Sequence, residues 1–411
     1  MDREQKAPQT QAMTLSKGAA LQKKPEPGYW ARVWALYRQA FRGLLIALPI
    51  FVVIFMITCP HAFNYDSVFG FAKDLKSAAS FVSNDYQTVT YTFASGECRA
   101  IPYRGGLATV NEQGIEVYAP DGERTLDVPL SFSAPRAVAS RKYLLAYDFG
   151  ATAFTVTNAY SRLFWTDTEF PIYAASIGES GRFALITGSD TYLSEVLLYD
   201  ANFNLIQHFG RASATTGASI SANGRYLALS GIYSEGGKAG SLIELYRIGA
   251  QSASFSLRLE GEVPLDVSFT DNRHIALTTD RALRVYDISG ECESEISFEG
   301  ATLSRVLCSE QGCVLVLEDD VLDLEQRVLC VSKKGALLCD VNVKGDVKAV
   351  SLAAGYAYLL LEGRVMRLNA QDGALLELSC PEGAITLHAI DDVRVRIAYA
   401  AQAIYLNFEE T

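Results

Sequence analysis

Histidine is scarce in this chain of 411 residues. The chain has four histidines, and at least 66 residues separate each one from the next. Transition-metal sites in proteins usually draw their imidazole and thiolate ligands from short, clustered motifs. We therefore predict no metal site. The four isolated residues are His61, His208, His274 and His388.

The familiar signatures of catalysis and nucleotide binding are missing as well. No G-x-S-x-G nucleophile elbow occurs, because the nearest match, "GESGRF", places Ser180 one residue short of the pattern. Neither a Walker A sequence nor a dinucleotide-binding fingerprint is present. We predict no catalytic residue and no cofactor, which favours a non-enzymatic protein.

Excess positive charge is absent from most of the chain. The net charge is −11, and residues 1–42 carry eight Lys or Arg against three Asp or Glu, so the remainder carries 28 basic and 44 acidic residues. Nucleic-acid binding depends on basic side chains that neutralise phosphates. An acidic body therefore argues against nucleic acid as a partner.

One long run of uncharged residues is present at 43–59, which reads GLLIALPIFVVIFMITC. Its seventeen residues are close to the minimum length of a transmembrane helix. The neighbouring basic residues precede it, which places the N-terminus in the cytoplasm by the positive-inside rule. We predict an uncleaved signal anchor in the cell membrane, with the C-terminal domain on the extracytoplasmic side.

A cleaved signal peptide or a lipid anchor would fit this run less well. A cleaved signal peptide has a short basic lead and a small-residue cleavage site, whereas here the lead is 42 residues and "PHAFNYD" follows. A lipid-modified Cys59 would need small residues before it, and "MIT" is a poor match. Around the anchor we expect a disordered cytoplasmic tail at 1–28, an amphipathic juxtamembrane segment at 29–42, and a linker with a short helix at 60–86.

The rest of the chain contains an internal repeat. Short apolar segments follow a turn at eight places, with intervals of 37, 40, 43, 48, 39, 43 and 39 residues. An average of about 41 residues is typical of the blades of a β-propeller. The segments start at Gly106, Tyr143, Phe183, Tyr226, His274, Cys313, Tyr356 and Val395.

A second alternating segment follows most of the first ones, as in "LRVYDISG" and "RVMRLNAQDG". Such alternation before a Gly, Asn or Asp turn is typical of a half-buried strand that enters a hairpin. We predict an all-β domain at 87–411, an eight-bladed propeller of four-stranded antiparallel blades, with seven blades as the alternative. The last unit lacks a fourth strand, and we expect "QTVTYTF" at 87–93 to supply it.

The segment "ANGRYLALSG", followed further along by "LYR", resembles the degenerate blades of WD-repeat and quinoprotein-like propellers. A basic tail, one span and such a propeller together resemble an uncharacterised family of membrane-anchored, extracytoplasmic propeller proteins of Gram-positive anaerobes. That resemblance implies the fold and the anchor but no activity. The regular Trp of quinone-cofactor propellers is missing, since the tryptophans are Trp30, Trp34 and Trp165.

Several predicted loops stand out from the repeat and should share one face of the propeller. They span 188–195, 210–219, 230–241 and the acidic run 317–327. The acidic run has no central Gly for a calcium loop, which favours a solvated connection. Loops on a rigid scaffold often carry binding residues. The candidates for binding are Tyr192, Arg211, Tyr233, Glu235, Asp319 and Asp320.

Four cysteines flank two predicted hairpin turns. Cys308 and Cys313 surround "SEQG", and Cys330 and Cys339 surround "VSKKGALL". Direct cross-strand neighbours lie close to the distance range that a disulfide permits. Each pair is therefore a candidate disulfide, with buried free thiols as the alternative.

Two functions from different classes fit these observations. The first is a non-enzymatic, membrane-anchored module that binds or scaffolds an envelope protein or glycan. The second is an extracytoplasmic enzyme or cofactor-binding propeller that uses its central channel, which inward-facing charged residues from several blades would favour. Signalling through the N-terminal tail is a third possibility with less support.

Overall fold

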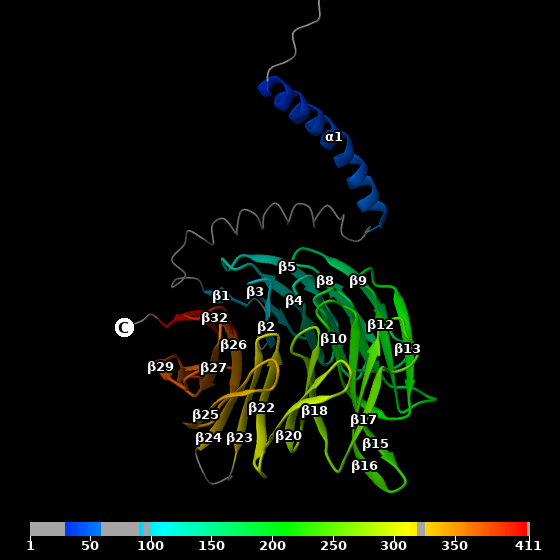
Figure 1. Cartoon of the computed structure of the whole chain (residues 1–411). Coiled ribbons are helices and arrows are strands. Elements are labelled where there is room, and N and C mark those ends of the chain that lie inside the picture. Colours follow the sequence, from blue (N-terminus) through cyan, green and yellow to red (C-terminus); the bar gives the residue numbers. More distant parts are fainter. Residues whose placement is uncertain (1–28, 59–89, 94–98, 319–324, 409–411) are drawn as a thin grey trace, which may run out of the picture. The chain divides into compact units, whose positions relative to one another are not determined.

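A computed structural model of the chain describes residues 29–58, 90–93, 99–318 and 325–408 (Figure 1). The chain divides into two compact units, Met1–Pro60 and His61–Thr411. The predicted tail at 1–28 and the predicted linker helix at 60–86 lie outside the described residues.

The described residues of the first unit form one helix, α1, which spans Tyr29–Thr58 and includes Pro49. Segments 29–42 and 43–58, which the sequence analysis separates, therefore form one continuous helix. Among the described residues, no helix combines the length and the hydropathy that crossing a membrane requires. The prediction of a transmembrane helix is not confirmed.

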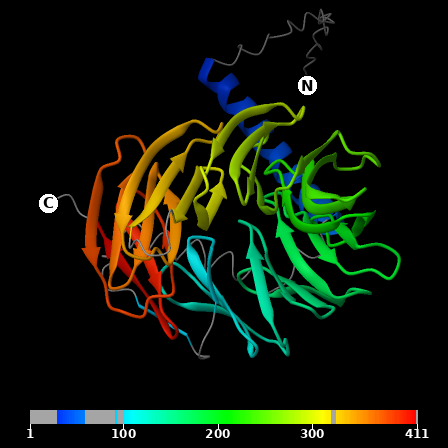
Figure 2. The same ribbon diagram turned by 90° about the horizontal axis from the view of Figure 1, so that it is seen from below.

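The second unit is a β-propeller. Its described residues form eight four-stranded antiparallel sheets, which follow one another around a ring (Figure 2). The first four blades are β2 (Arg99–Tyr103), β3 (Gly106–Val110), β4 (Gly114–Tyr118) and β5 (Arg124–Pro129); β6 (Pro135–Ala139), β7 (Leu144–Asp148), β8 (Ala153–Thr157) and β9 (Arg162–Asp167); β10 (Ile172–Ile177), β11 (Phe183–Thr187), β12 (Ser194–Tyr199) and β13 (Leu205–Arg211); and β14 (Ala214–Ile220), β15 (Tyr226–Glu235), β16 (Lys238–Arg247) and β17 (Phe255–Glu260).

The other four blades complete the ring and confirm eight blades rather than seven. They are β18 (Pro264–Phe269), β19 (His274–Thr279), β20 (Ala282–Asp287) and β21 (Cys292–Ser297); β22 (Thr302–Ser309), β23 (Gly312–Glu318), β24 (Glu325–Val331) and β25 (Leu337–Lys344); β26 (Ala349–Ala353), β27 (Tyr356–Leu361), β28 (Arg364–Asn369) and β29 (Leu375–Ser379); and β30 (Thr386–Ala389), β31 (Arg394–Ala398), β32 (Gln402–Asn407) and β1 (Tyr91–Thr92).

Burial explains why the repeated apolar segments are the best markers of the fold. The second strands β3, β7, β11 and β19 are buried at every residue, because neighbouring blades cover both of their faces. The outermost strand β17 instead alternates between half-buried and exposed residues. The hydrophobic clusters accordingly join adjacent blades, as where β11 and β12 pack against β15.

The repeated "SANG" and "GESG" phrases form the turns between first and second strands. In "SANG" the amide of Gly224 donates to the carbonyl of Ser221 at 2.7 Å, and Gly224 has a φ of 66°. Gly181 plays the same role in the preceding blade with a φ of 86°. Glycine suits this position because a side chain is strained at positive φ.

The ring closes where the N-terminal strand β1 pairs with β32 of the last blade. This confirms the prediction that residues near 90 supply the missing fourth strand. The guanidinium of Arg396 on β31 is buried at the closure and donates to the carbonyls of Gly105 and Gly106 and to the hydroxyl of Tyr405. It also stacks 4.9 Å from the ring of Tyr91, whose hydroxyl lies 2.6 Å from that of Tyr405.

Removing the side chain of Tyr91 should open this closure. Tyr91 is 0% exposed, and truncating a buried aromatic residue costs about 3–5 kcal/mol of unfolding free energy. We expect Tyr91→Ala to lose an amount of this order in urea unfolding followed by circular dichroism. Tyr192→Ala is the matched control, because Tyr192 is 48% exposed and should lose less than about 0.5 kcal/mol. Equal losses would contradict this account of the closure.

Candidate functional site

The propeller has two faces that differ in their connections. The loop face carries the connections from second to third strands and from each fourth strand to the next blade. The turn face carries the connections from first to second and from third to fourth strands. First strands of consecutive blades contact one another, and β30 contacts β2, so the eight first strands surround the channel. Antiparallel order thus places the predicted loops at 188–195, 210–219 and 230–241 at the loop face, whereas residues 319–324 of the fourth predicted loop lie outside the described residues.

A cavity of about 720 Å³ lies at the channel mouth on the loop face. Its wall combines Arg99 at the start of β2, Arg136 at the start of β6, and residues 111–113 between β3 and β4. Phe149 and Ile385 add apolar surface from blades 2 and 8. A narrower cavity of about 320 Å³ shares the two arginines and Ile385, and Tyr147 and Thr386 extend its wall.

The wall of the larger cavity carries two guanidinium groups, those of Arg99 and Arg136, and the carboxylate of Glu112, so its formal charge is positive in an acidic protein. No described residue forms an ion pair with the guanidinium of Arg99 or Arg136. Arg136 instead stacks on Phe149 at 3.9 Å from the ring centre, which fixes the orientation of its side chain. Burial raises the pKa of Tyr147, and the nearby charge of Arg136 opposes that rise. The Tyr147 hydroxyl is therefore a neutral hydrogen-bonding group beside two cations.

At the turn face, an exposed arginine lies at the other end of the channel. Arg141 of blade 2 forms ion pairs with Glu179 of blade 3 at 3.4 Å and with Glu310 of blade 6 at 3.9 Å. Blades 2 and 6 stand opposite each other in an eight-bladed ring, so this side chain crosses the opening. The adjoining cavity of about 450 Å³ has Glu179 and Glu310 in its wall. Carboxylates therefore line the turn-face cavity, whereas arginines line the cavity on the loop face.

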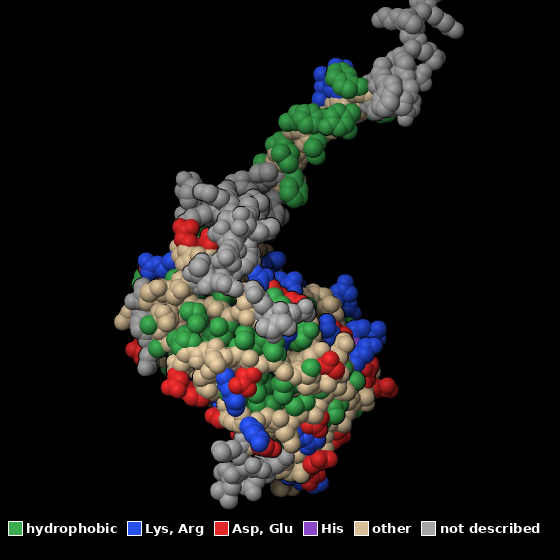
Figure 3. Space-filling model, turned by 90° about the vertical axis from the view of Figure 1, so that its left-hand side faces the viewer, with side chains coloured by type: hydrophobic (Ala, Val, Ile, Leu, Met, Phe, Trp, Pro, Cys, Tyr) green, Lys and Arg blue, Asp and Glu red, His purple; other side chains and the backbone are tan. Residues whose placement is uncertain are grey.

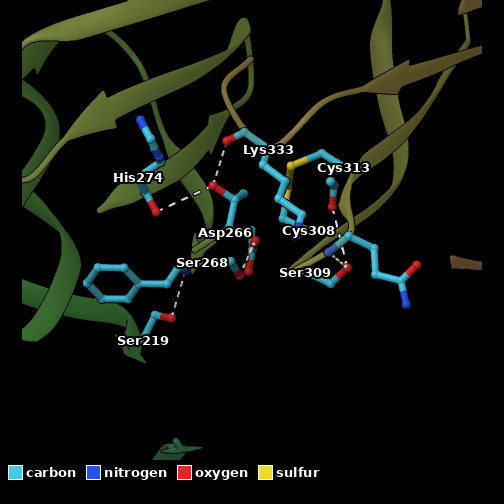
Figure 4. The surroundings of a disulfide bond; sticks show 12 residues. Ser219, Asp266, Ser268, His274, Cys308, Ser309, Cys313 and Lys333 are labelled. Atoms are coloured by element: carbon cyan, nitrogen blue, oxygen red, sulfur yellow. Dashed lines mark hydrogen bonds between the residues drawn. A yellow bond between two sulfur atoms is a disulfide. The ribbon is translucent and has the colours of Figure 1, made fainter. Parts of the chain in front are cut away.

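Asp266 on the first strand β18 is the carboxyl that burial affects most clearly. Burial raises its pKa. The hydrogen bond that the Ser268 hydroxyl donates to Asp266 at 2.9 Å opposes that rise (Figure 4). Asp266 lies outside the walls of the two cavities that Arg99 and Arg136 line.

The structure does not bring the binding residues that the sequence suggested into this cavity. Arg211 forms a salt bridge with Glu244 and donates to the Tyr246 hydroxyl at 2.6 Å. Tyr233 is buried beneath the guanidinium of Arg258, which also pairs with Glu235 at 2.7 Å. Arg211, Tyr233 and Glu235 therefore interact with side chains of blade 4.

The remaining candidates lie elsewhere. Tyr192 is exposed on the loop face, and Asp319 and Asp320 lie outside the described residues. The loop expected at 210–219 is shorter than predicted, because β13 and β14 extend to leave only Ala212 and Ser213 between them. The loop expected at 230–241 is a long hairpin of β15 and β16.

Sequence reasoning missed Arg99 and Arg136 although the repeat contains a signal for them. The two residues lie 37 positions apart, which equals the first interval of the repeat. Arg99 pairs with Val110, and Arg136 pairs with Tyr147, also 37 positions apart. Equivalent positions of adjacent blades lie side by side around the channel, and the two arginines accordingly line the same cavities.

Both candidate cysteine pairs are direct cross-strand neighbours in blade 6. Cys308 pairs with Cys313 between β22 and β23, and a disulfide joins them (Figure 4). Cys330 pairs with Cys339 between β24 and β25, and both are free thiols. Burial is the main cause that raises the pKa of Cys330, and the neighbouring thiol of Cys339 raises it further.

A model of one protein family matches residues 80–376, which is more than half of the chain. The chain belongs to this family, DUF5711, a family of unknown function. The match begins just before β1 and extends into β29, so the DUF5711 region covers most of the propeller. A search of curated proteins found no match to the chain.

Solved structures share the fold of this DUF5711 protein at low sequence identity. Sqt1 from Chaetomium thermophilum, solved bound to the N-terminus of the ribosomal protein L10, is 11% identical with a TM-score of 0.54, over 79% of this chain and 100% of that one. A eukaryotic initiation factor is 11% identical with a TM-score of 0.52, over 78% of this chain and 90% of that one. Such neighbours agree with the expectation of WD-repeat-like blades and show the fold alone.

The cysteine assignment can be checked by alkylation without reduction, followed by peptide mass spectrometry. The peptide that contains Cys308 and Cys313 should be two hydrogens lighter than its dithiol form and unmodified. Cys292, which is exposed, should be alkylated in the folded protein, whereas Cys330 should react only after unfolding because a buried thiol with a raised pKa forms little thiolate. Alkylation of Cys308 and Cys313 in the unreduced protein would contradict the assignment.

Proposed function

We propose that this DUF5711 protein is a binding module that takes a negatively charged ligand in the arginine-lined cavity on its loop face. The observation that carries the proposal is that Arg99 and Arg136, from adjacent blades, line one cavity without an ion pair to any described residue, and that they outnumber the carboxylate of Glu112 in the same wall. A binding role agrees with the rigid ring of blades, because loops on such a scaffold hold their positions.

The chemistry of arginine selects the ligand's charged group. A guanidinium presents a planar fork of N–H donors that matches carboxylate or phosphate oxygens, and such charge-assisted hydrogen bonds are about twice as strong as neutral ones. Two guanidinium groups from adjacent strands can hold one such group from two sides. The acidic surface elsewhere would repel anions, so the charge of this mouth also provides selectivity.

We propose further that helix α1 attaches the propeller to a membrane, which would make the protein an anchored module of the cell envelope. Supporting this, apolar side chains along α1 such as Leu44, Ile46 and Phe51 are more than half exposed. Figure 3 shows hydrophobic side chains along the helix and basic ones at one end. Arg38 and Arg42 precede the apolar stretch, as in a helix whose basic end remains with the lipid headgroups.

The fold comparison is consistent with a binding role. Sqt1, which shares the fold, was solved bound to the N-terminus of another protein. A propeller of this kind can therefore present its surface to a protein segment. For the chain described here, an envelope protein or a glycan is the proposed class of partner.

Anion binding is best tested by titrating the full-length protein in detergent with citrate at constant ionic strength. Loss of a hydrogen bond to a charged group costs about 1.5–3 kcal/mol, so Arg99→Gln and Arg136→Gln should each weaken citrate binding at least tenfold. Arg305→Gln is the matched control, since Arg305 also lies on a first strand but outside the cavity. The proposal fails if citrate does not bind the native protein, or if all three variants bind equally.

Membrane attachment can be tested by flotation of the full-length protein with liposomes. The native protein should float with the vesicles and resist extraction by alkaline carbonate. The double variant Ile46→Lys and Phe51→Lys should stay in the soluble fraction, because each charge would have to enter the apolar region. Substituting Leu337 and Leu338 of β25 by Lys is the control and should leave flotation unchanged. Extraction of the native protein by carbonate would contradict the anchor.

A further inference from the structure

Exposed apolar side chains are concentrated on the loop face of the propeller. Among the described residues, eight large ones, between 37% and 69% exposed, lie in its connections or at the adjoining strand ends. The other exposed large apolar residues in the described part of the propeller belong to the outermost strands β9, β13, β25 and β29. The eight are Phe149, Tyr173, Tyr192, Leu193, Ile232, Val263, Leu265 and Ile385.

Part of this apolar surface is continuous with the arginine-lined cavity. Ile385 and Phe149 belong to the wall of the cavity itself, and Arg136 stacks on Phe149. The ring of Phe149 in turn meets that of Tyr173 edge to face, with 6.2 Å between centroids. A path of apolar side chains therefore leads from the two guanidinium groups of blades 1 and 2 to the first strand of blade 3.

Exposed apolar side chains that adjoin a charged pocket suit an amphipathic ligand. Contiguous apolar patches on soluble surfaces usually mark interaction sites, and protein interfaces are enriched in arginine and aromatic residues. Apolar side chains such as Ile385, Phe149 and Tyr173 gain from burial against those of a ligand. A glycan offers mainly hydroxyl groups, which would lose hydrogen bonds to water at such a surface.

We propose that the ligand is a segment of a partner protein that combines a carboxylate with apolar side chains. The carboxylate lies between Arg99 and Arg136, and the apolar side chains pack against Phe149, Tyr173 and Ile385. This inference rests on the proposed function, since it names the ligand of the same cavity. The positive mouth complements an acidic segment, whereas the rest of the acidic propeller repels one.

The experiment selects peptides that bind the full-length protein in detergent from a phage-displayed library of random sequences of about ten residues. Peptides recovered on the native protein should be enriched in Asp or Glu together with Leu, Ile or Phe. Selection on the double variant Arg99→Gln and Arg136→Gln should lose the acidic enrichment. Peptides from the native selection are then synthesised with a fluorescent label and their dissociation constants measured by anisotropy.

The variant Tyr173→Ser tests binding of the peptide's apolar side chains separately from anion binding, the function on which the inference rests. Tyr173 is outside the wall of the cavity, so this variant should bind citrate like the native protein. Its affinity for the selected peptides should fall about tenfold, the effect expected of a residue at the centre of an interface. Leu338→Ser is the control, because Leu338 is similarly exposed but lies on the outermost strand β25, and its peptide affinity should not change.

The outcomes distinguish failure of the peptide ligand from failure of anion binding. If citrate binds but the selection yields no apolar enrichment, or Tyr173→Ser binds peptides normally, the ligand is a simple anion or an acidic glycan and the inference is wrong. The proposed function then stands. If neither citrate nor any peptide depends on Arg99 and Arg136, both claims are wrong.

Discussion

The structure depends on one closure, the pairing of the N-terminal strand β1 with β32 in the last blade. The chain runs directly from each blade to the next, so every blade except the first and the last is joined by the chain to both of its neighbours. An open ring would leave an unpaired strand edge in the last blade, which is an energetic and aggregation liability. The buried Arg396 joins the two ends of the ring, because it bonds the carbonyls of Gly105 and Gly106 in blade 1 from its place in blade 8.

The same closure creates the candidate site. Ile385 and Thr386 belong to blade 8, Arg99 to blade 1 and Arg136 to blade 2, so the cavity exists only where the ends of the ring meet. His388 on β30 reinforces this junction by a contact of 3.2 Å from its Nε2 to the carbonyl of Ala100 on β2. Burial lowers the pKa of His388 to about 4, and the charge of Arg396 adds to this effect. The junction is therefore held by a neutral imidazole near neutral pH.

The repeat predicted the fold well, and it did not single out the residues that line the arginine cavity. Second strands such as Phe183–Thr187 are buried on both faces, so their apolar composition is visible in the sequence and marks each blade. The closing strand followed from counting strands in the last unit. The binding candidates were chosen from irregular loops, but Arg211 and Tyr233 are held by Glu244 and Arg258, which no local pattern reveals. Arg99 and Arg136 lie on regular strands, where only their equivalence across the repeat unit indicates that they converge.

The most direct test of this account is a crystal structure of the full-length protein grown with selenate, whose selenium atom is located by anomalous scattering. The account predicts a selenate ion between Arg99 and Arg136, within hydrogen-bonding distance of both guanidinium groups. Selenate bound at other arginines while this cavity holds none would contradict the central claim.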